Sequence, residues 1–148
     1  MRRVRPLAAL RKDRQGVATL EFAVVAPVLL LIMFGMAEFG IVLNQYLTLT
    51  NATIVGASQF AFSAGVDGTP YSDAISAINT AATGLTPLTI TLSVNGTQCT
   101  TDTGCQAALA GGVGSVTVTA TYSCAAMNIV FNLLPNCTLT SQATERVQ

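Results

Sequence analysis

The longest apolar run of the chain covers residues 17–43 and is interrupted only by Thr19, Glu21, Glu38 and several glycines. Its uncharged core, residues 22–37, would span about 24 Å as an α-helix, whereas residues 17–43 would span about 40 Å. Because a bilayer core requires about 30 Å, a membrane-spanning helix must take in more than the uncharged core. The pattern therefore predicts one membrane helix with at least one glutamate near the hydrocarbon boundary, which is an energetically expensive position.

Pro27 lies inside this run. A proline in the interior of a soluble helix costs about 3 kcal/mol, but membrane helices tolerate it because neighbouring groups satisfy the freed carbonyl. We therefore expect a kink or a locally loosened turn at residues 23–27. Proline and glycine are also common in ordinary membrane helices, so Pro27, Gly35 and Gly40 have that simpler interpretation as well.

Beyond the apolar run the chain becomes rich in Ala, Thr and Asn and contains no proline before Pro70. Near-helical spacing predicts that the helix continues outside the membrane to about Ser63. The residues that carry this spacing are Leu43, Leu47, Ile54, Ala57 and Ala61. The GVDGTP sequence at 65–70 predicts a break. A second, short helix is predicted at 72–82, with Ser72 as its cap and Gly84 at its end.

The last part of the chain has the alternating pattern of β-strands. Residues 89–94 alternate cleanly and end in the turn signal Asn95-Gly96, and residues 115–122 alternate again after a glycine-rich stretch. Residues 137–144 form a third, weaker candidate, whereas residues 125–136 leave helix, loop and strand open. These segments predict a small antiparallel sheet that packs on the extramembrane half of the long helix.

The fold class is therefore α+β, with a long N-terminal hydrophobic helix followed by a small head that holds a short helix and an antiparallel sheet. Three segments are predicted: a basic leader at 1–16, the long helix at 17–64, which spans the membrane in its first half, and the head at 65–148. A head of this size has little core, so disulfides would suit it.

The charges divide the chain unevenly. Six of the seven basic residues lie in the first fourteen positions, and the seventh is Arg146. Basic residues directly before an apolar run mark the cytoplasmic side of a membrane. A short basic arm can also bind nucleic acid, but the remainder of the chain offers no basic patch, so no nucleic acid is expected. A cut after Gly16 would leave one basic and six acidic residues.

All four cysteines lie in the last third of the chain, at Cys99, Cys105, Cys124 and Cys137. Exported cysteines oxidise, and an even count suits two disulfides. Sequence order favours Cys99–Cys105 and Cys124–Cys137, although the other two pairings remain open. The spacings do not match those of zinc sites and the chain has no histidine, so no metal is expected.

Catalysis finds no support in the sequence. The chain has no histidine, few carboxylates and no nucleophile motif, so we expect neither an enzyme nor a cofactor. Turn or helix-cap roles are expected for Asp67, Asp73 and Asp102. Three glycosylation sequons, which begin at Asn51, Asn95 and Asn136, are assigned no function because such short motifs arise by chance.

The sequence RQGVATLEF at 14–22 resembles the processing site of type IV-like prepilins, in which a prepilin peptidase cuts after the glycine. The resemblance implies cleavage between Gly16 and Val17, with Glu21 and Phe22 as the fifth and sixth mature residues. Cleavage would create an α-amine that is charged near neutral pH. A carboxylate one helical turn away can neutralise that amine, in its own chain or in a neighbouring one.

A closer resemblance is to the TadE-like family, the minor pilins of tight-adherence (Tad/Flp) systems. It rests on RQGVATLEFAVVAPVLLLIMFGMAEFG, on the following LTNAT and GAS, and more loosely on VTVTATYSC and the Thr/Ser-rich tail with its arginine. It implies a structural subunit of a type IV-like pilus, with a pilin-like helix in the bacterial inner membrane, a cytoplasmic N-terminus and an exported head. The implied partners are the prepilin peptidase, the major pilin, other minor pilins, the inner-membrane assembly platform and membrane lipid.

Other interpretations remain open. A secretory signal peptide would be cut after Ala37 and would release a soluble protein that begins at Glu38. A plain single-span anchor would retain its leader, and Glu21 would then merely flank the membrane helix near the headgroups. Glycine between a basic arm and a helix, as at Gly16, is often only a helix breaker.

Overall fold

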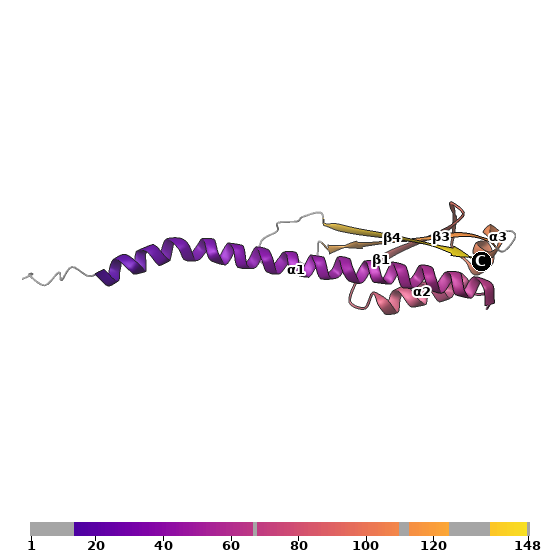
Figure 1. Ribbon diagram of the computed structural model, residues 1–148, viewed down its shortest axis with the longest axis horizontal. Helices are drawn as coiled ribbons and strands as arrows, with labels where there is room; N and C mark the ends of the chain where they lie inside the picture. The colour runs from indigo at the N-terminus through magenta and orange to yellow at the C-terminus, as the bar shows by residue number, and fades with distance from the viewer. Residues whose placement is uncertain (1–13, 67, 110–112, 125–136, 148) are drawn as a thin grey trace, which may run out of the picture. The chain divides into compact units, whose positions relative to one another are not determined.

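The computed structural model of the chain describes residues 14–66, 68–109, 113–124 and 137–147. The described elements confirm the α+β class, since a long N-terminal helix is followed by short helices and a four-stranded antiparallel sheet (Figure 1). The chain divides into two compact units, Met1–Phe39 and Gly40–Gln148. The predicted leader lies outside the described residues up to position 13. The elements are, in order, α1 (Arg14–Val66), α2 (Pro70–Ala81), β1 (Leu88–Val94), β2 (Thr97–Cys99), α3 (Asp102–Ala108), β3 (Gly114–Ser123) and β4 (Thr138–Val147).

Helix α1 confirms the predicted long helix and ends at Val66, three residues beyond the expected Ser63. It continues through Pro27 as a helix. Within Gly40–Gln148, the buried residues of α1 recur at helical spacing and form a stripe along one side. The members of this stripe are Gln45, Leu49, Ala52, Thr53, Gly56, Ala57, Phe60 and Ser63. Leu43, Leu47 and Ile54, whose spacing predicted the helix, are exposed instead.

Helix α2 confirms the predicted second helix but begins two residues earlier, with Pro70 in its first turn. Proline suits that position because its missing N–H has no partner in the first turn of a helix. The predicted cap was therefore wrong: Ser72 lies inside the helix, and its backbone N–H and hydroxyl both donate to the carboxylate of Asp102. Gly84, at φ +90°, lies three residues past the end of the helix.

The sheet has the strand order β2-β1-β3-β4 and is antiparallel throughout. A two-residue turn joins β1 to β2, and Asn95 (φ 51°) and Gly96 (φ 83°) both have the positive φ that such hairpin turns require. All three predicted strands are present, and the weakest candidate extends to Val147 as β4. In β3 the residues Val116, Val118, Ala120 and Tyr122 are buried, and the threonines between them lie on the other face.

Two short elements, β2 and α3, were not predicted from the sequence. The side chain of Thr101 caps α3 by accepting a hydrogen bond from the backbone N–H of Gly104 at 3.1 Å. A disulfide between Cys99 and Cys105 joins β2 to α3. Elements this short have no periodicity to read, so the cap and the crosslink define them.

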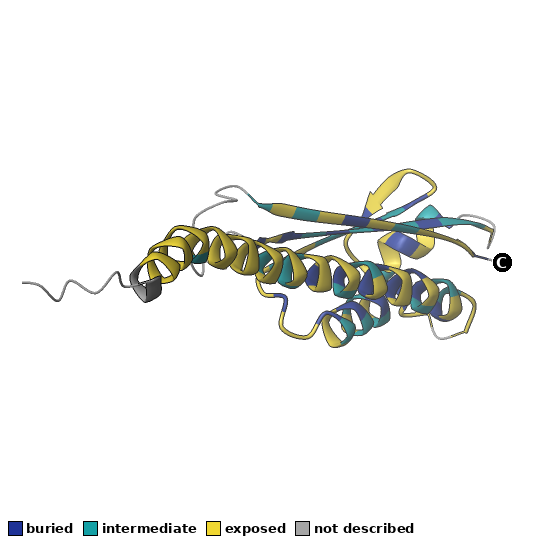
Figure 2. Cartoon of the chain, turned by 60° about the vertical axis from the view of Figure 1, so that its left-hand side comes forward, coloured by how far each residue is buried: buried dark blue, intermediate teal, exposed yellow. Residues whose placement is uncertain are grey.

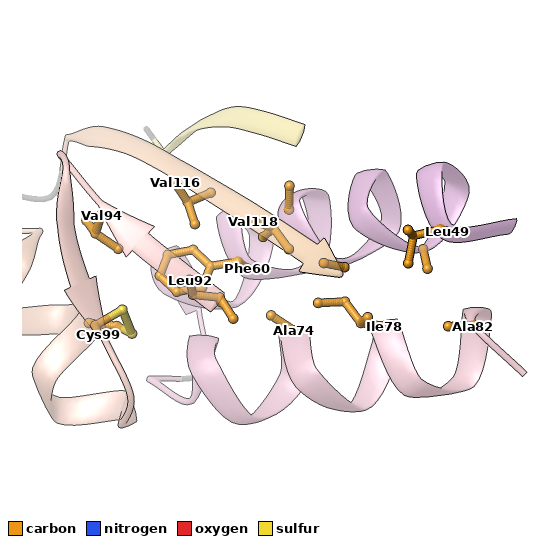
Figure 3. Packing of buried hydrophobic residues seen from close by; sticks show 14 of the residues in the cluster. Leu49, Phe60, Ala74, Ile78, Ala82, Leu92, Val94, Cys99, Val116 and Val118 are labelled. Carbon is orange, nitrogen blue, oxygen red and sulfur yellow. A yellow bond between two sulfur atoms is a disulfide. The ribbon is translucent and has the colours of Figure 1, made fainter. Parts of the chain in front are cut away.

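One hydrophobic core lies between the C-terminal half of α1, helix α2 and the sheet. Phe60 and Leu49 of α1, Ile78 of α2, and Leu92 and Val118 of the sheet are almost fully buried in it (Figure 3). Gly56 allows α1 and α2 to approach closely, since a Cβ at this position would lie 2.2 Å from Cγ1 of Ile78. All the buried hydrophobic residues of the described chain belong to Gly40–Gln148.

Candidate membrane and processing segment

Residues 17–39 of α1 expose apolar side chains in every direction around the helix axis (Figure 2). Seven consecutive large apolar residues, at positions 28–34, are between 42% and 65% exposed, and together they cover almost two full helical turns. An 18-residue stretch of α1 has a mean hydropathy of 2.4, and none of it is buried. A helix that is apolar on all sides is stable in a membrane or inside a larger assembly, not in water.

Glu21 is the first charged side chain of this segment that the structure describes. It is exposed and lies on one helical face with Leu20, Val24 and Val25, which line a shallow apolar groove. Phe22, the next residue, is 67% exposed. The carboxylate is therefore presented to the surroundings from an apolar surface, where a nearby cation would interact with it more strongly than in bulk water.

The predicted cleavage site lies within the first turn of α1, which begins at Arg14. Val17, the residue after the bond, is 58% exposed. Glu21 lies four positions after Val17, which corresponds to about 6 Å along a helix axis, or about one turn. The helical spacing thus brings the position of the predicted new amine and the carboxylate to the same side of the helix.

Pro27 is exposed and lies six residues after Glu21 within the same continuous helix. Its ring leaves the carbonyl four residues earlier, that of Ala23, without its usual helical donor. The predicted kink at residues 23–27 stays a prediction, because the continuity of the helix does not test it.

Glu38 is the second charged residue of the apolar segment. Its side chain is partly exposed, but Oε1 is buried and has no hydrogen-bond partner among the residues that the structure describes. The sequence shows a glutamate in an apolar stretch, where a charge is costly. Burial of one oxygen was not readable from the sequence, since it depends on the rotamer and on the neighbouring side chains.

Hydroxyl groups join the second half of α1 to the sheet. Thr53 Oγ1 lies 3.0 Å from Ser141 Oγ in the buried interface between α1 and β4. Thr53 also donates to the carbonyl of Thr50 at 2.8 Å, and Ser141 donates to the Thr50 hydroxyl at 3.4 Å. These bonds satisfy polar groups that would otherwise be costly to bury, and they hold the helix on the sheet.

The cysteines form the two disulfides that sequence order favoured. Cys99 is joined to Cys105, and Cys124 to Cys137, each with a Cα–Cα separation of 5.1 Å. The second disulfide links the end of β3 to the residue before β4, on either side of residues 125–136, for which the sequence left the structure open and which lie outside the described residues. Both crosslinks lie within Gly40–Gln148, which gives a small core additional stability.

Two acidic residues of the head, Asp73 and Asp102, have structural contacts. The two hydrogen bonds from Ser72 lower the pKa of Asp102 because they favour its charged form. Asp73 accepts a hydrogen bond from Thr69 in the first turn of α2, and Asp67 lies outside the described residues.

No group of three potential metal ligands occurs in the described ranges. Asn95 has both ends of its amide bonded, to Ala108 and Ser115.

The length and composition of α1 are compatible with a single membrane span, followed by a folded head. Residues 16–58 match the model of the TadE family, described as TadE-like protein. This match confirms the predicted resemblance to the TadE-like family over the segment that contains Gly16, Glu21, Pro27 and Glu38. No curated protein and no solved structure matches the chain.

Proposed function

We propose that this chain is a minor pilin or pseudopilin subunit of a tight-adherence, type IV-like pilus. Its role is structural: it primes, caps or supports the fibre, or contributes to surface adhesion. The observation that carries this proposal is the apolar segment at residues 17–39, which is exposed on all sides and lies within the match to the TadE-like family. Such a surface requires lipid before assembly and other apolar helices afterwards.

In this proposal the prepilin peptidase removes residues 1–16 on the cytoplasmic side of the inner membrane. The new α-amine of Val17 and the carboxylate of Glu21 then neutralise each other, within one chain or between neighbours. On insertion scales an unpaired charge costs about 2.5–3.5 kcal/mol at the bilayer centre and less toward the surface. Pairing between subunits would therefore favour one axial register of packed helices.

The subunit remains anchored by one span with its head in the periplasm or outside, and later joins the pilus or stays at its base. Its partners are the prepilin peptidase, the major pilin, other minor pilins, the inner-membrane assembly platform and lipid. Two disulfides in the head suit an oxidising compartment. The core of the head lies entirely within Gly40–Gln148, so removal of the segment before it would not take away any buried core residue.

The decisive measurement is the mature N-terminus of membrane-extracted protein, by intact mass and N-terminal peptide mapping, with and without the prepilin peptidase. We expect a start at Val17 that depends on the peptidase. Glu21→Gln should retain this start but lose incorporation into pili, because the isosteric amide cannot neutralise the amine.

Two results would contradict the proposal. A retained leader in cells with active peptidase would indicate a plain single-span anchor. A start at Glu38, with the protein recovered in the soluble fraction, would indicate a secreted protein released from a signal peptide. In either case Glu21→Gln should have no effect on pilus assembly.

A further inference from the structure

Glu38 is the only charged residue between Glu21 and Asp67. It lies seventeen residues after Glu21, which is about 26 Å along a helix axis and close to the thickness of a bilayer core. A carboxylate at the boundary of the bilayer core costs less than one at its centre, but a carboxylate oxygen removed from water remains unfavourable unless a cation or hydrogen bonds compensate it. Its placement in an otherwise uncharged stretch therefore requires a physical reason.

The surroundings of Glu38 are apolar. Phe34 lies one helical turn before it, Val42 one turn after it, and the adjacent Phe39 is 69% exposed. Oε1 of Glu38 is buried without a hydrogen-bond partner in the described part of the chain, while the side chain as a whole remains partly accessible. A cation that approaches this side would meet a partly desolvated carboxylate, and their attraction would be stronger than at a fully hydrated surface.

The chain itself offers few cations for this role. Positions 15–145 contain no lysine or arginine. Six of the seven basic residues lie at positions 2–14, in the predicted leader. The remaining basic side chain, Arg146, stands opposite Ser115 in the register of β3 and β4 and lines a pocket with Asn95 and Val113 at that end of the sheet. Because Oε1 of Glu38 has no hydrogen-bond partner among the described residues, we look for its compensating charge on another molecule.

We propose that the carboxylate of Glu38 binds a basic side chain, lysine or arginine, on another subunit of the pilus assembly. This inference rests on the proposed function. A lipid amine could neutralise Glu38 only while the subunit remains in the bilayer, whereas a basic side chain of a neighbour can do so in the membrane and in the fibre. Glu38 is thus a residue that selects a partner subunit by charge, separate from the pairing assigned to Glu21.

The test uses the full-length chain in cells that assemble pili. A photo-crosslinking residue, Phe39→p-benzoyl-phenylalanine, is placed beside Glu38, and the adducts are identified by mass spectrometry. We expect an adduct with a pilus subunit near a lysine or arginine. The yield of this adduct should fall by about tenfold or more with Glu38→Gln, because the amide keeps the shape but removes the charge. The matched control Glu145→Gln, which removes an exposed carboxylate of β4, should leave the yield unchanged.

Charge exchange completes the test. Glu38→Lys should abolish the adduct, and a glutamate in place of the partner's lysine or arginine nearest the crosslink should restore it. The proposal is wrong if Glu38→Gln leaves the adduct unchanged, if the adducts contain only lipid, or if charge exchange fails to restore the contact. The mature N-terminus is measured on the same membranes, so a start at Val17 with no charge-dependent adduct would refute this inference alone.

Discussion

The two halves of α1 share a continuous helical backbone but differ in the burial of their side chains. Residues 17–39 expose large apolar side chains on every side, whereas residues 40–66 bury one stripe against α2 and the sheet (Figure 2). The first half has no buried residue among those described, and the second half supplies Leu49 and Phe60 to the core. Helical propensity alone cannot account for this difference, since both halves are helical.

The difference shows that the part of α1 that packs against the head is distinguished by the helical spacing of its buried residues and not by its overall hydrophobicity. In residues 40–66 the buried side combines large residues such as Leu49 and Phe60 with small or hydroxyl residues that permit close packing, such as Gly56, Ala57 and Thr53. In residues 17–39 bulky apolar residues follow one another without a polar side, so no single face is selected. A helix of that kind obtains its stability from lipid or from several neighbouring helices.

The largest expected effect comes from two phenylalanines that are two positions apart. Phe60 is fully buried, and Phe62 is 63% exposed. Phe60→Ala should lower the free energy of unfolding of the head by about 3–5 kcal/mol, because it removes core contacts and leaves a cavity. Phe62→Ala should change it by less than about 0.5 kcal/mol. Urea unfolding of the full-length protein in detergent measures both, and equal losses would contradict the one-sided packing of this half.

A charge placed in each half gives the next largest effect. Leu30→Arg adds a cation to the middle of residues 22–37 and should disfavour membrane insertion by about 2.5–3.5 kcal/mol. Val55→Arg, at a residue of similar exposure in the second half, should leave insertion unchanged. The fraction of protein that resists alkaline carbonate extraction measures insertion.

The contrast between the two arginine variants is what this experiment tests. If Leu30→Arg remained fully inserted while Val55→Arg did not, the membrane-spanning part of α1 would have to be reassigned to residues 40–66. Unfolding of the head, measured in the same preparations, should be unchanged in Leu30→Arg, because Leu30 belongs to neither the core nor its unit.

Much of the fold was predictable because its long elements have strong patterns. Alternation of apolar and polar residues at 89–94 and 115–122 predicted β1 and β3 to within one residue at each end. The pair Asn95-Gly96 predicted the turn after β1. Helix α1 was predicted to within three residues at its C-terminal end. These features depend on local sequence, so a single sequence is sufficient to predict them.

The features that were missed depend on contacts between distant residues. Ser72 looked like a cap, but its partner Asp102 lies thirty positions away and draws it into a link between α2 and α3. Elements β2 and α3 are held by the disulfide between Cys99 and Cys105 and by the cap at Thr101. In the candidate site, the order of glycine, glutamate and proline was readable, whereas the buried oxygen of Glu38 and the role of Gly56 were not.

The smallest expected effect has opposite signs at two glycines of α1. Gly56→Ala would place a Cβ 2.2 Å from Cγ1 of the fully buried Ile78, so α1 and α2 must move apart. We expect a loss of about 1–3 kcal/mol in the free energy of unfolding, as in other overpacked cores. Gly40→Ala meets nothing within 4 Å and replaces a poor helix former, so it should be neutral or stabilising by up to about 1 kcal/mol.

The double variant Gly56→Ala with Ile78→Ala separates steric overlap from other causes. Ile78→Ala alone should destabilise the head, because it removes a fully buried side chain. In the double variant the methyl group added at position 56 occupies space that the Ile78 side chain has vacated, so the two losses should be clearly less than additive. Strict additivity in urea unfolding would show that Gly56 serves the helix backbone and not the contact with α2. A loss in the double variant that is smaller than the sum of the two single losses would show that Gly56 is needed for the close contact between α1 and Ile78 of α2.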